Sequence, residues 1–328
     1  MIRIGTVGTG FIVDNFFDAV SRVPDMEVTC VYSREKEKAR EFAKKHGAAR
    51  YSCDRAAFLG DEALDFVYVA SPNSLHFEWA RDALCAGRNV ICEKPFVSTS
   101  RELRELIALA REKELFLFEA ITVPHLPNYR LLRAHLGDIG APRLAQLNFS
   151  QYSSRYKAFL EGKDPNVFSP AFSGGALMDI NYYNLYFLLG LFGEPQDIAY
   201  LPNLAANGID TSGILTLRYD GTVCTAVGAK DSRSENFAQL QGERGYIYMR
   251  GESSRCLGFD VHTAEGQTHY DVQTDENALV YELRDFADIF LSKDVLRLDE
   301  LFENSLLAMR MTEKARLGAG IRFPADAG

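Results

Sequence analysis

The N-terminal segment of this chain limits the fold more than any other stretch. Residues 2–7 form a short apolar run with strand character, two glycines follow at once, and apolar residues then recur at helical spacing. A strand, a Gly-x-Gly turn and a helix in this order bind the pyrophosphate of a dinucleotide, because glycine lets the backbone approach the phosphates at the helix N-terminus. The third glycine position of the motif is occupied by Val13. The residues predicted to contact the dinucleotide here are Gly8, Thr9, Gly10, Phe11 and Ile12.

The same alternation of strand and helix continues through the first third of the chain. Apolar runs at 28–32, 65–70, 90–92 and 115–118 alternate with segments in which apolar residues have helical spacing. Regular alternation of this kind is typical of a doubly wound parallel sheet with helices on both faces. We therefore predict an NAD(P)-binding Rossmann domain over residues 1–120.

The end of the second predicted strand bears on the choice of cofactor. An acidic residue at this point binds the ribose 2′-hydroxyl of NAD, whereas this chain has Ser33 and Arg34, followed by Lys36 and Lys38. A hydroxyl and cations suit a 2′-phosphate, so we predict that NADP(H) is preferred, with NAD(H) as the alternative. The competing interpretation is that these charges belong to the solvated surface of the next helix.

Polar residues follow two further predicted strands, at the edge where ligands bind in open α/β sheets. The first group comes after residues 65–70, and the second ends the strand 90–92 with Glu93, Lys94 and the rigid Pro95. Asn73 has a second interpretation as a helix cap, and Glu93 and Lys94 have one as solvated loop charges. The predicted cofactor-binding residues at this edge are Ser71, Pro72, Asn73, His76, Glu93 and Lys94.

The pattern changes after residue 120, where a helix over 126–135 leads into a long strand at 143–153. Short strand-like runs then follow, separated by turns such as Asp220-Gly221, which is a hairpin signal. We predict that residues 121–328 form an α+β domain with an open, mostly antiparallel sheet, which binds substrate and mediates oligomerisation. The remaining strands are expected at 212–219, 223–229, 237–241, 246–250 and 258–262, and two helices at 276–291 and 299–317.

A helix that begins after Ser173 carries the second candidate group of reactive side chains. Asp179 and Tyr183 are four residues apart and therefore share one helical face. A tyrosine has a pKa of about 10, but an adjacent ammonium such as that of Lys94 favours its phenolate and allows it to exchange protons. The alternative is a buried, hydrogen-bonded Asp–Tyr pair with only a structural role.

Several of these segments together resemble the Gfo/Idh/MocA family (glucose–fructose oxidoreductase/inositol dehydrogenase-like). The resemblance rests on Gly8-Thr9-Gly10, on Ser71-Pro72-Asn73 with His76, and on the segments AGRNVICEKP and GGALMDI, and spans residues 1 to about 195. It implies an NAD(P)-dependent oxidoreductase acting on sugars, inositols or related alcohols. Many members have a histidine where this chain has Tyr183, so the chain is similar to the Lys–Tyr branch that contains dimeric dihydrodiol dehydrogenase.

The resemblance implies a set of catalytic roles. Lys94 would polarise the reacting oxygen, Tyr183 would exchange its proton, and Asp179 would fix the geometry. Two other functions remain open, a non-catalytic cofactor-sensing regulatory protein on the same fold and a dihydrodiol or dicarbonyl reductase. His125 would either line the pocket or pack in the joint between the domains. The candidate substrate contacts are Lys94, His125, Tyr156, Asn181 and Tyr183.

Composition argues against several other classes of function. The net charge of −9 disfavours nucleic acid, and the most apolar run, 185–192, is far shorter than the ~20 residues of a membrane helix. Six cysteines without a CxxC motif indicate reduced thiols, and with no signal peptide expected we predict a cytoplasmic location. The six histidines show no HxH or HExxH spacing, so no metal site is predicted. By the family resemblance we expect a homodimer or higher oligomer through the C-terminal sheet, and a sugar or polyol derivative as the small-molecule partner.

Overall fold

The computed structural model describes residues 1–327, which form two compact units. Unit 1 comprises Met1–Ala120 together with Asn277–Leu306, and unit 2 comprises Ile121–Glu276 together with the chain from Leu307 onward. The first division falls at residue 120, where the sequence pattern changes. The segment Asn277–Leu306, however, packs with the first unit, whereas the sequence analysis assigned it to the second domain.

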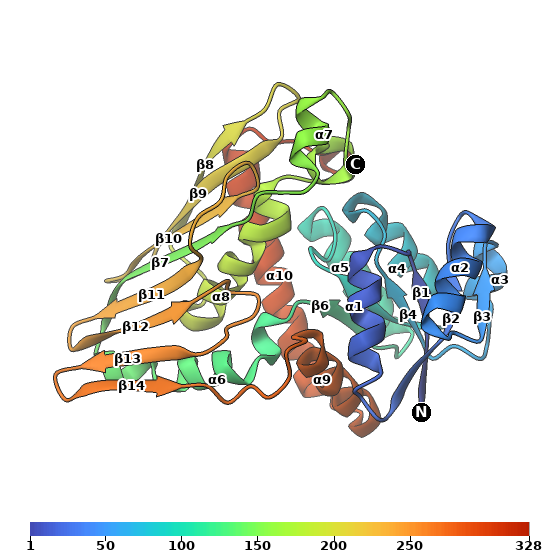
Figure 1. Ribbon diagram of the computed structural model, residues 1–328, viewed down its shortest axis with the longest axis horizontal. Helices are drawn as coiled ribbons and strands as arrows, with labels where there is room; N and C mark the ends of the chain where they lie inside the picture. The colour runs from blue at the N-terminus through green and yellow to red at the C-terminus, as the bar shows by residue number, and fades with distance from the viewer. Residues whose placement is uncertain (328) are drawn as a thin grey trace. The chain divides into compact units, whose positions relative to one another are not determined.

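Unit 1 is built on a six-stranded sheet in the order β3-β2-β1-β4-β5-β6 (Figure 1). All of its strand pairs are parallel, which confirms the predicted doubly wound sheet. The inner strands β1, β4 and β5 are almost entirely buried and mostly apolar, as parallel strands covered by helices are expected to be. The strands are β1 (Ile2–Val7), β2 (Met26–Tyr32), β3 (Arg50–Ser52), β4 (Phe66–Val69), β5 (Asn89–Glu93) and β6 (Leu117–Ala120).

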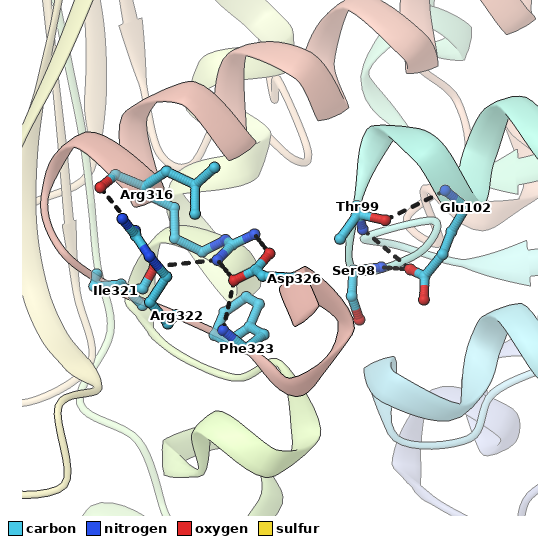
Figure 2. Close-up of polar contacts among 9 residues, drawn as sticks. Ser98, Thr99, Glu102, Arg316, Ile321, Arg322, Phe323 and Asp326 are labelled. Carbon is cyan, nitrogen blue, oxygen red and sulfur yellow. Dashed lines mark hydrogen bonds and ion pairs between the residues drawn. The ribbon is translucent and has the colours of Figure 1, made fainter. Parts of the chain in front are cut away.

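Helices connect and cover these strands, with α1 beside α9 and α4 beside α5. The helix α5 begins with a capping box, in which the Thr99 hydroxyl accepts from the Glu102 N–H at 3.2 Å (Figure 2). The Glu102 carboxylate in return accepts from the N–H groups of Ser98 and Thr99, at 3.0 and 3.1 Å. The helices of this unit are α1 (Phe11–Val20), α2 (Lys36–His46), α3 (Arg55–Leu59), α4 (His76–Cys85), α5 (Ser100–Glu112), α9 (Leu279–Ser292) and the first part of α10 (Val295–Gly318).

Aromatic packing explains why α9 belongs to unit 1. The Phe286 ring stacks on the Phe118 ring of β6 with centroids 4.4 Å apart, and Phe290 meets Phe66 edge to face at 5.0 Å. Aromatic side chains bury large apolar areas, so these contacts fix α9 against the sheet. The helical periodicity of 276–291 predicts a helix correctly, but periodicity does not say which sheet the apolar face covers.

Unit 2 contains an eight-stranded sheet in the order β14-β13-β12-β11-β7-β10-β9-β8 (Figure 1). Only β10 and β7 pair in parallel, so the sheet is mostly antiparallel, as predicted. The strands are β7 (Pro142–Ser150), β8 (Asp197–Leu204), β9 (Asp210–Arg218), β10 (Val223–Ala229), β11 (Phe237–Gly242), β12 (Gly245–Arg250), β13 (Phe259–Thr263) and β14 (Gly266–Tyr270).

One face of this sheet forms the core of unit 2. The long apolar helix α8 (Tyr182–Phe192) packs against β7 and β10, and a π-helical turn, Leu177–Asn181, leads into it. The other helices of the unit are α6 (Pro127–Ala134), α7 (Tyr156–Leu160) and the second part of α10. Within residues 1–327, no helix combines the length and apolar character required to cross a membrane.

Candidate active site

The glycine-rich turn after β1 has the geometry that a dinucleotide requires. Gly8 has φ +115°, and a Cβ there would lie 2.8 Å from the carbonyl oxygen of Ala70, so only glycine fits. Gly10 caps α1 without any side-chain hydrogen bond, and no atom lies within 4 Å of the place its Cβ would take. The uncapped N–H groups of this helix therefore suit a pyrophosphate, which needs donors and space. Phe11 is 77% exposed at the same end, whereas Val13, at the third motif position, is fully buried.

Thr9 and Ile12 complete this turn as half-buried residues. The end of β2 provides the next group of predicted contacts, where Ser33 is half-buried and Arg34 is exposed. Lys38 pairs with Glu35 at 2.6 Å and is therefore already engaged on the surface of α2. A contact of Ser33 and Arg34 with a 2′-phosphate remains a prediction.

The loop after β4 keeps its three predicted residues, Ser71, Pro72 and Asn73, half-buried. Asn73 begins a 3-10 turn that leads into α4, whose N-cap position is Leu75. A role in cofactor binding remains a prediction for these three residues.

His76 lies inside unit 1 and connects two loops. Its ring nitrogens are 2.9 Å from the Ser71 carbonyl oxygen and 3.0 Å from the Pro95 carbonyl oxygen. Burial lowers the pKa of His76, the Lys94 charge lowers it further, and the hydrogen bonds to backbone carbonyls oppose this shift. These contacts give His76 a structural role, since it ties the loop after β4 to the turn after β5. Its predicted contact with the cofactor is not tested by them.

Glu93 is the last residue of β5 and Lys94 follows it, but the two side chains have different surroundings. Glu93 is buried and accepts a hydrogen bond from the Tyr68 hydroxyl at 2.5 Å, which rules out a solvated loop charge. Lys94 is half-buried, and a cis peptide bond joins it to Pro95. The Phe96 N–H donates to the Glu119 carboxylate at 3.0 Å, so the backbone that follows Lys94 is anchored as well.

A third carboxyl group lies beneath this turn and was not foreseen. Glu282 of α9 is fully buried, and within the described residues neither of its carboxyl oxygens has a hydrogen-bond partner. Burial raises the pKa of Glu282 well above its usual value, and the charges of Glu93 and Glu119 raise it further. The sequence does indicate this burial, because Glu282 lies between Leu279 and Phe286 on the buried face of α9.

Unit 2 presents the second group of predicted residues on one helix. Between Ala176 and Leu189 every side chain is buried except Asp179 and Tyr183, which are both half-buried. The two residues therefore project on the same side of an otherwise enclosed segment, as their spacing predicted. Asp179 lies in the π-helical turn, a type of distortion that is frequent at functional sites.

Lys230, which directly follows β10, is a functional candidate that the sequence analysis missed. Its ammonium forms an ion pair with the Asp179 carboxylate, and its side chain is only 7% exposed. A lone lysine after an apolar strand gives no sequence signal that distinguishes it from a surface cation.

Three further candidates lie elsewhere in unit 2. Asn181 is fully buried, and its amide donates to the Ala226 carbonyl at 3.0 Å, which favours a structural role. Tyr156 is half-buried at the start of α7, where burial and then the Asp231 charge raise the pKa of its phenol. His125 is buried in a 3-10 turn, Val123–His125. Contact of these residues with a substrate remains a prediction.

Comparisons with known proteins agree with this description over nearly the whole chain. The family model "Oxidoreductase family, NAD-binding Rossmann fold" matches residues 2–120, and "GFO/IDH/MocA C-terminal domain" matches residues 132–248. The scyllo-inositol 2-dehydrogenase (NADP(+)) IolU of Bacillus subtilis is 36% identical over 327 residues, which cover 99% of each chain. The human trans-1,2-dihydrobenzene-1,2-diol dehydrogenase is 29% identical over 76% of this chain and 74% of its own length.

A solved structure shows the same fold. The 3-ketoreductase KijD10 of Actinomadura kijaniata, crystallised with NADP and TDP-benzene, superposes with a TM-score of 0.84 at 23% identity, covering 97% of both chains. The sheet topology, the glycine turn and the family models that match both domains lead to one assignment. The chain belongs to the Gfo/Idh/MocA family of oxidoreductases.

Proposed function

We propose that this protein transfers a hydride between NADP(H) and a carbon of a polyol or sugar-like substrate that carries a hydroxyl or carbonyl group. The observation that carries this proposal is the pair Asp179 and Tyr183, which alone reach out of an otherwise buried helical segment. The relative from Bacillus subtilis, named as an NADP(+)-dependent scyllo-inositol dehydrogenase, supports an inositol-like substrate.

The catalytic roles follow from the chemistry of the three side chains. When bound, the nicotinamide supplies the group that accepts or donates the hydride. Lys94 provides an ammonium that polarises the reacting oxygen, and Tyr183 takes or returns the hydroxyl proton. Asp179 orients the substrate, because a carboxylate accepts hydrogen bonds from hydroxyl groups. Lys94 belongs to unit 1, whereas Asp179 and Tyr183 belong to unit 2, so their action on one substrate is part of the proposal.

Turnover of a polyol panel with NADP+ and NAD+ in parallel tests the proposal. The Lys94→Ala and Tyr183→Phe variants should each lose about 10²–10⁴ in kcat, the range that general acid–base groups contribute, while NADPH binding measured by fluorescence is retained. Lys44→Ala and Tyr246→Phe, which change exposed residues of the same type, are the matched controls. Near-normal turnover in both catalytic variants would refute the mechanism, and wild-type NADPH binding without turnover of any substrate would favour a cofactor-sensing protein.

The cofactor preference is tested separately at the end of β2. We propose that Ser33 and Arg34 receive the 2′-phosphate. Arg34→Ala should therefore lower kcat/KM for NADP+ by about tenfold, the scale of one charge-assisted hydrogen bond, and leave the value for NAD+ nearly unchanged. Arg104→Ala, which removes an exposed arginine from α5, is the control. An equal loss with both cofactors would contradict a 2′-phosphate contact.

A second candidate substrate class is supported by the human relative, which is named as a dehydrogenase of trans-1,2-dihydrobenzene-1,2-diol. The same lysine and tyrosine would serve this reaction, because it also removes a hydride and a proton from a secondary alcohol. Including this dihydrodiol and an α-dicarbonyl compound in the substrate panel decides between the two classes by the ratio of their kcat/KM values.

We also propose self-association through the outer face of the eight-stranded sheet. Apolar residues are exposed on paired strands of this face: Leu201 lies opposite Ile214, and Leu144 lies opposite Val223, with 41–69% of each residue exposed. Replacing Leu201 and Ile214 with lysine should convert the assembly to a monomer in light-scattering measurements.

All six cysteines are free thiols, which suits the cytoplasm as the proposed location.

A further inference from the structure

The lysine that follows β10 is held in place by backbone hydrogen bonds on both sides. The Lys230 N–H donates to the Thr211 carbonyl at 2.8 Å, and the Lys230 carbonyl accepts from the Ser153 N–H at 2.9 Å. Its side chain is 7% exposed, and its ammonium pairs with Asp179. Lysine is rarely buried without a partner, so this ion pair explains how the charge is tolerated.

The neighbouring residues show that the pair is built into the packing of strand and helix. Residues 226, 228 and 230 alternate with 227 and 229 along the strand and thus share one face. A Cβ on Gly228 would lie 2.5 Å from the Asn181 Cβ, so the absence of a side chain at Gly228 is what lets the π-helical turn approach β10. On the N-terminal side of Gly228, the Ala226 carbonyl accepts from the Asn181 amide at 3.0 Å. On its C-terminal side, Lys230 pairs with Asp179.

A second amide strengthens the same contact. The Asn184 side chain donates to the Val227 carbonyl and to the Asn181 side-chain oxygen, both at 3.0 Å, and the Ser253 hydroxyl donates to Asn184 at 2.7 Å. Hydrogen bonds therefore join β10 to the π-helical turn and to the start of α8. This packing sets the position of Lys230 relative to Asp179.

The two partners differ in accessibility. The Asp179 side chain is 31% exposed, whereas that of Lys230 is 7% exposed, so the carboxylate faces outward and the ammonium lies behind it. We propose that Lys230 is a positioning residue for hydride transfer, which fixes the direction of the Asp179 carboxylate toward the substrate through their ion pair. This inference rests on the proposed function, because it assigns Lys230 a role through Asp179. Lys230 itself is too enclosed to act as a second Lys94.

Kinetics of Lys230→Met and Lys230→Arg test the proposal. Methionine keeps the length of the side chain without its charge, so kcat should fall about 10- to 100-fold, the scale of one hydrogen bond to a charged group, with KM for NADP+ unchanged. Lys230→Arg should recover most of the rate. Lys163→Met, which changes a lysine that is 71% exposed, is the control.

A stability measurement separates this inference from the proposed function. In a double-mutant cycle of Lys230→Met and Asp179→Asn, the single variants should each lower the unfolding midpoint of unit 2, and the double variant should recover part of the loss. If the wild type turns over no substrate, the proposed function fails, and additive effects in the cycle would then refute the ion-pair role as well. If the wild type is active, an unchanged kcat in Lys230→Met would overturn the proposal.

Discussion

Two carboxyl groups, one in each unit, are held in different ways. In unit 1 the Glu282 carboxyl is fully buried, and within the described residues neither of its oxygens has a hydrogen-bond partner; burial raises its pKa, which favours the neutral acid. In unit 2 Asp326 is paired with the fully buried guanidinium of Arg316, with two contacts of 2.6 and 2.7 Å (Figure 2). Burial acts to raise the pKa of Asp326, but hydrogen bonds from Arg316 and from the Phe323 N–H hold it below its usual value.

This difference shows that burial alone does not determine how the fold accommodates a carboxyl group. The bidentate pair of Arg316 and Asp326 also fastens the C-terminal segment, because Arg316 donates to the Ile321 carbonyl at 3.1 Å and stacks over the Phe323 ring at 4.1 Å. Removing one partner of such a pair leaves an uncompensated charge, whereas removing a neutral acid leaves none. The Glu282 and Asp326 sites should therefore respond in opposite directions to the loss of their carboxyl group.

The largest effect is expected at the ion pair. Asp326→Asn should destabilise unit 2 by about 3–5 kcal/mol, because the buried Arg316 charge loses its partner. Hydrogen exchange at the Phe323 amide, which donates to Asp326 at 2.7 Å, measures the loss locally. Glu194→Gln breaks the more exposed pair with Arg310 and should change stability by no more than about 1 kcal/mol. Equal effects of the two variants would contradict the role of burial.

The next effect has the opposite sign. Glu282→Met should stabilise unit 1 by about 1–3 kcal/mol at neutral pH, because it removes buried oxygens without hydrogen-bond partners. The single tryptophan, Trp79, lies in unit 1, so its fluorescence during urea unfolding reports on this unit. A loss of stability in this variant would show that Glu282 has a partner of structural importance.

The pH dependence sharpens the contrast further. Because the folded-state pKa of Glu282 is raised, its stabilising contribution is complete below the unfolded pKa of about 4.3 and declines as the pH rises toward the folded value. The decline is at most about 1.4 kcal/mol per pH unit, and Glu282→Gln should remove it. Asp326 contributes with the opposite slope, since its lowered pKa makes its stabilisation decline as the pH falls through that value. A Glu282→Gln variant that keeps the pH slope of the wild type would contradict this assignment.

The smallest effect concerns a third way of holding a carboxyl group, the capping box of α5. Thr99→Ala should destabilise unit 1 by about 1 kcal/mol, the usual loss for an N-cap residue. Burial raises the pKa of Glu102, while the N–H groups of Ser98 and Thr99, the Thr99 side chain and the Arg101 charge oppose the shift. Thr268→Ala, at an exposed strand position, is the control and should leave the Trp79 transition unchanged.

The sequence predicted the elements whose pattern is local. Most parallel strands of unit 1 are short, mainly apolar runs between helical segments, and the Thr99–Glu102 spacing is a local signal for the start of α5. Strands β8 and β14 were not predicted. Pro202 and Asn203 interrupt the apolar pattern of β8, and β14 (Gly266–Tyr270) is polar and mostly exposed. Both strands lie at the edges of the eight-stranded sheet. Edge strands are not buried on both faces, so apolar residues are not required there.

The site residues divide in the same way. Asp179 and Tyr183 could be assigned to one face from their spacing within a single helix. Lys230 could not be, because its pairing with Asp179 joins residues 51 positions apart through the contact between β10 and the π-helical turn. Glu282 shows the same limit, since its neighbours Glu93 and Glu119 come from strands far earlier in the chain. Such three-dimensional neighbours depend on packing that no local pattern encodes.

The His76 side chain has a consequence for changing the cofactor specificity of this protein. One imidazole joins the backbone at Ser71 to the backbone at Pro95, the residue after Lys94. A substitution that shifts the loop after β4 to suit a different nucleotide will also displace Lys94. Redesign of nucleotide preference at this loop is therefore expected to alter the rate of the chemical step as well, whereas redesign at Ser33 and Arg34 bypasses this linkage.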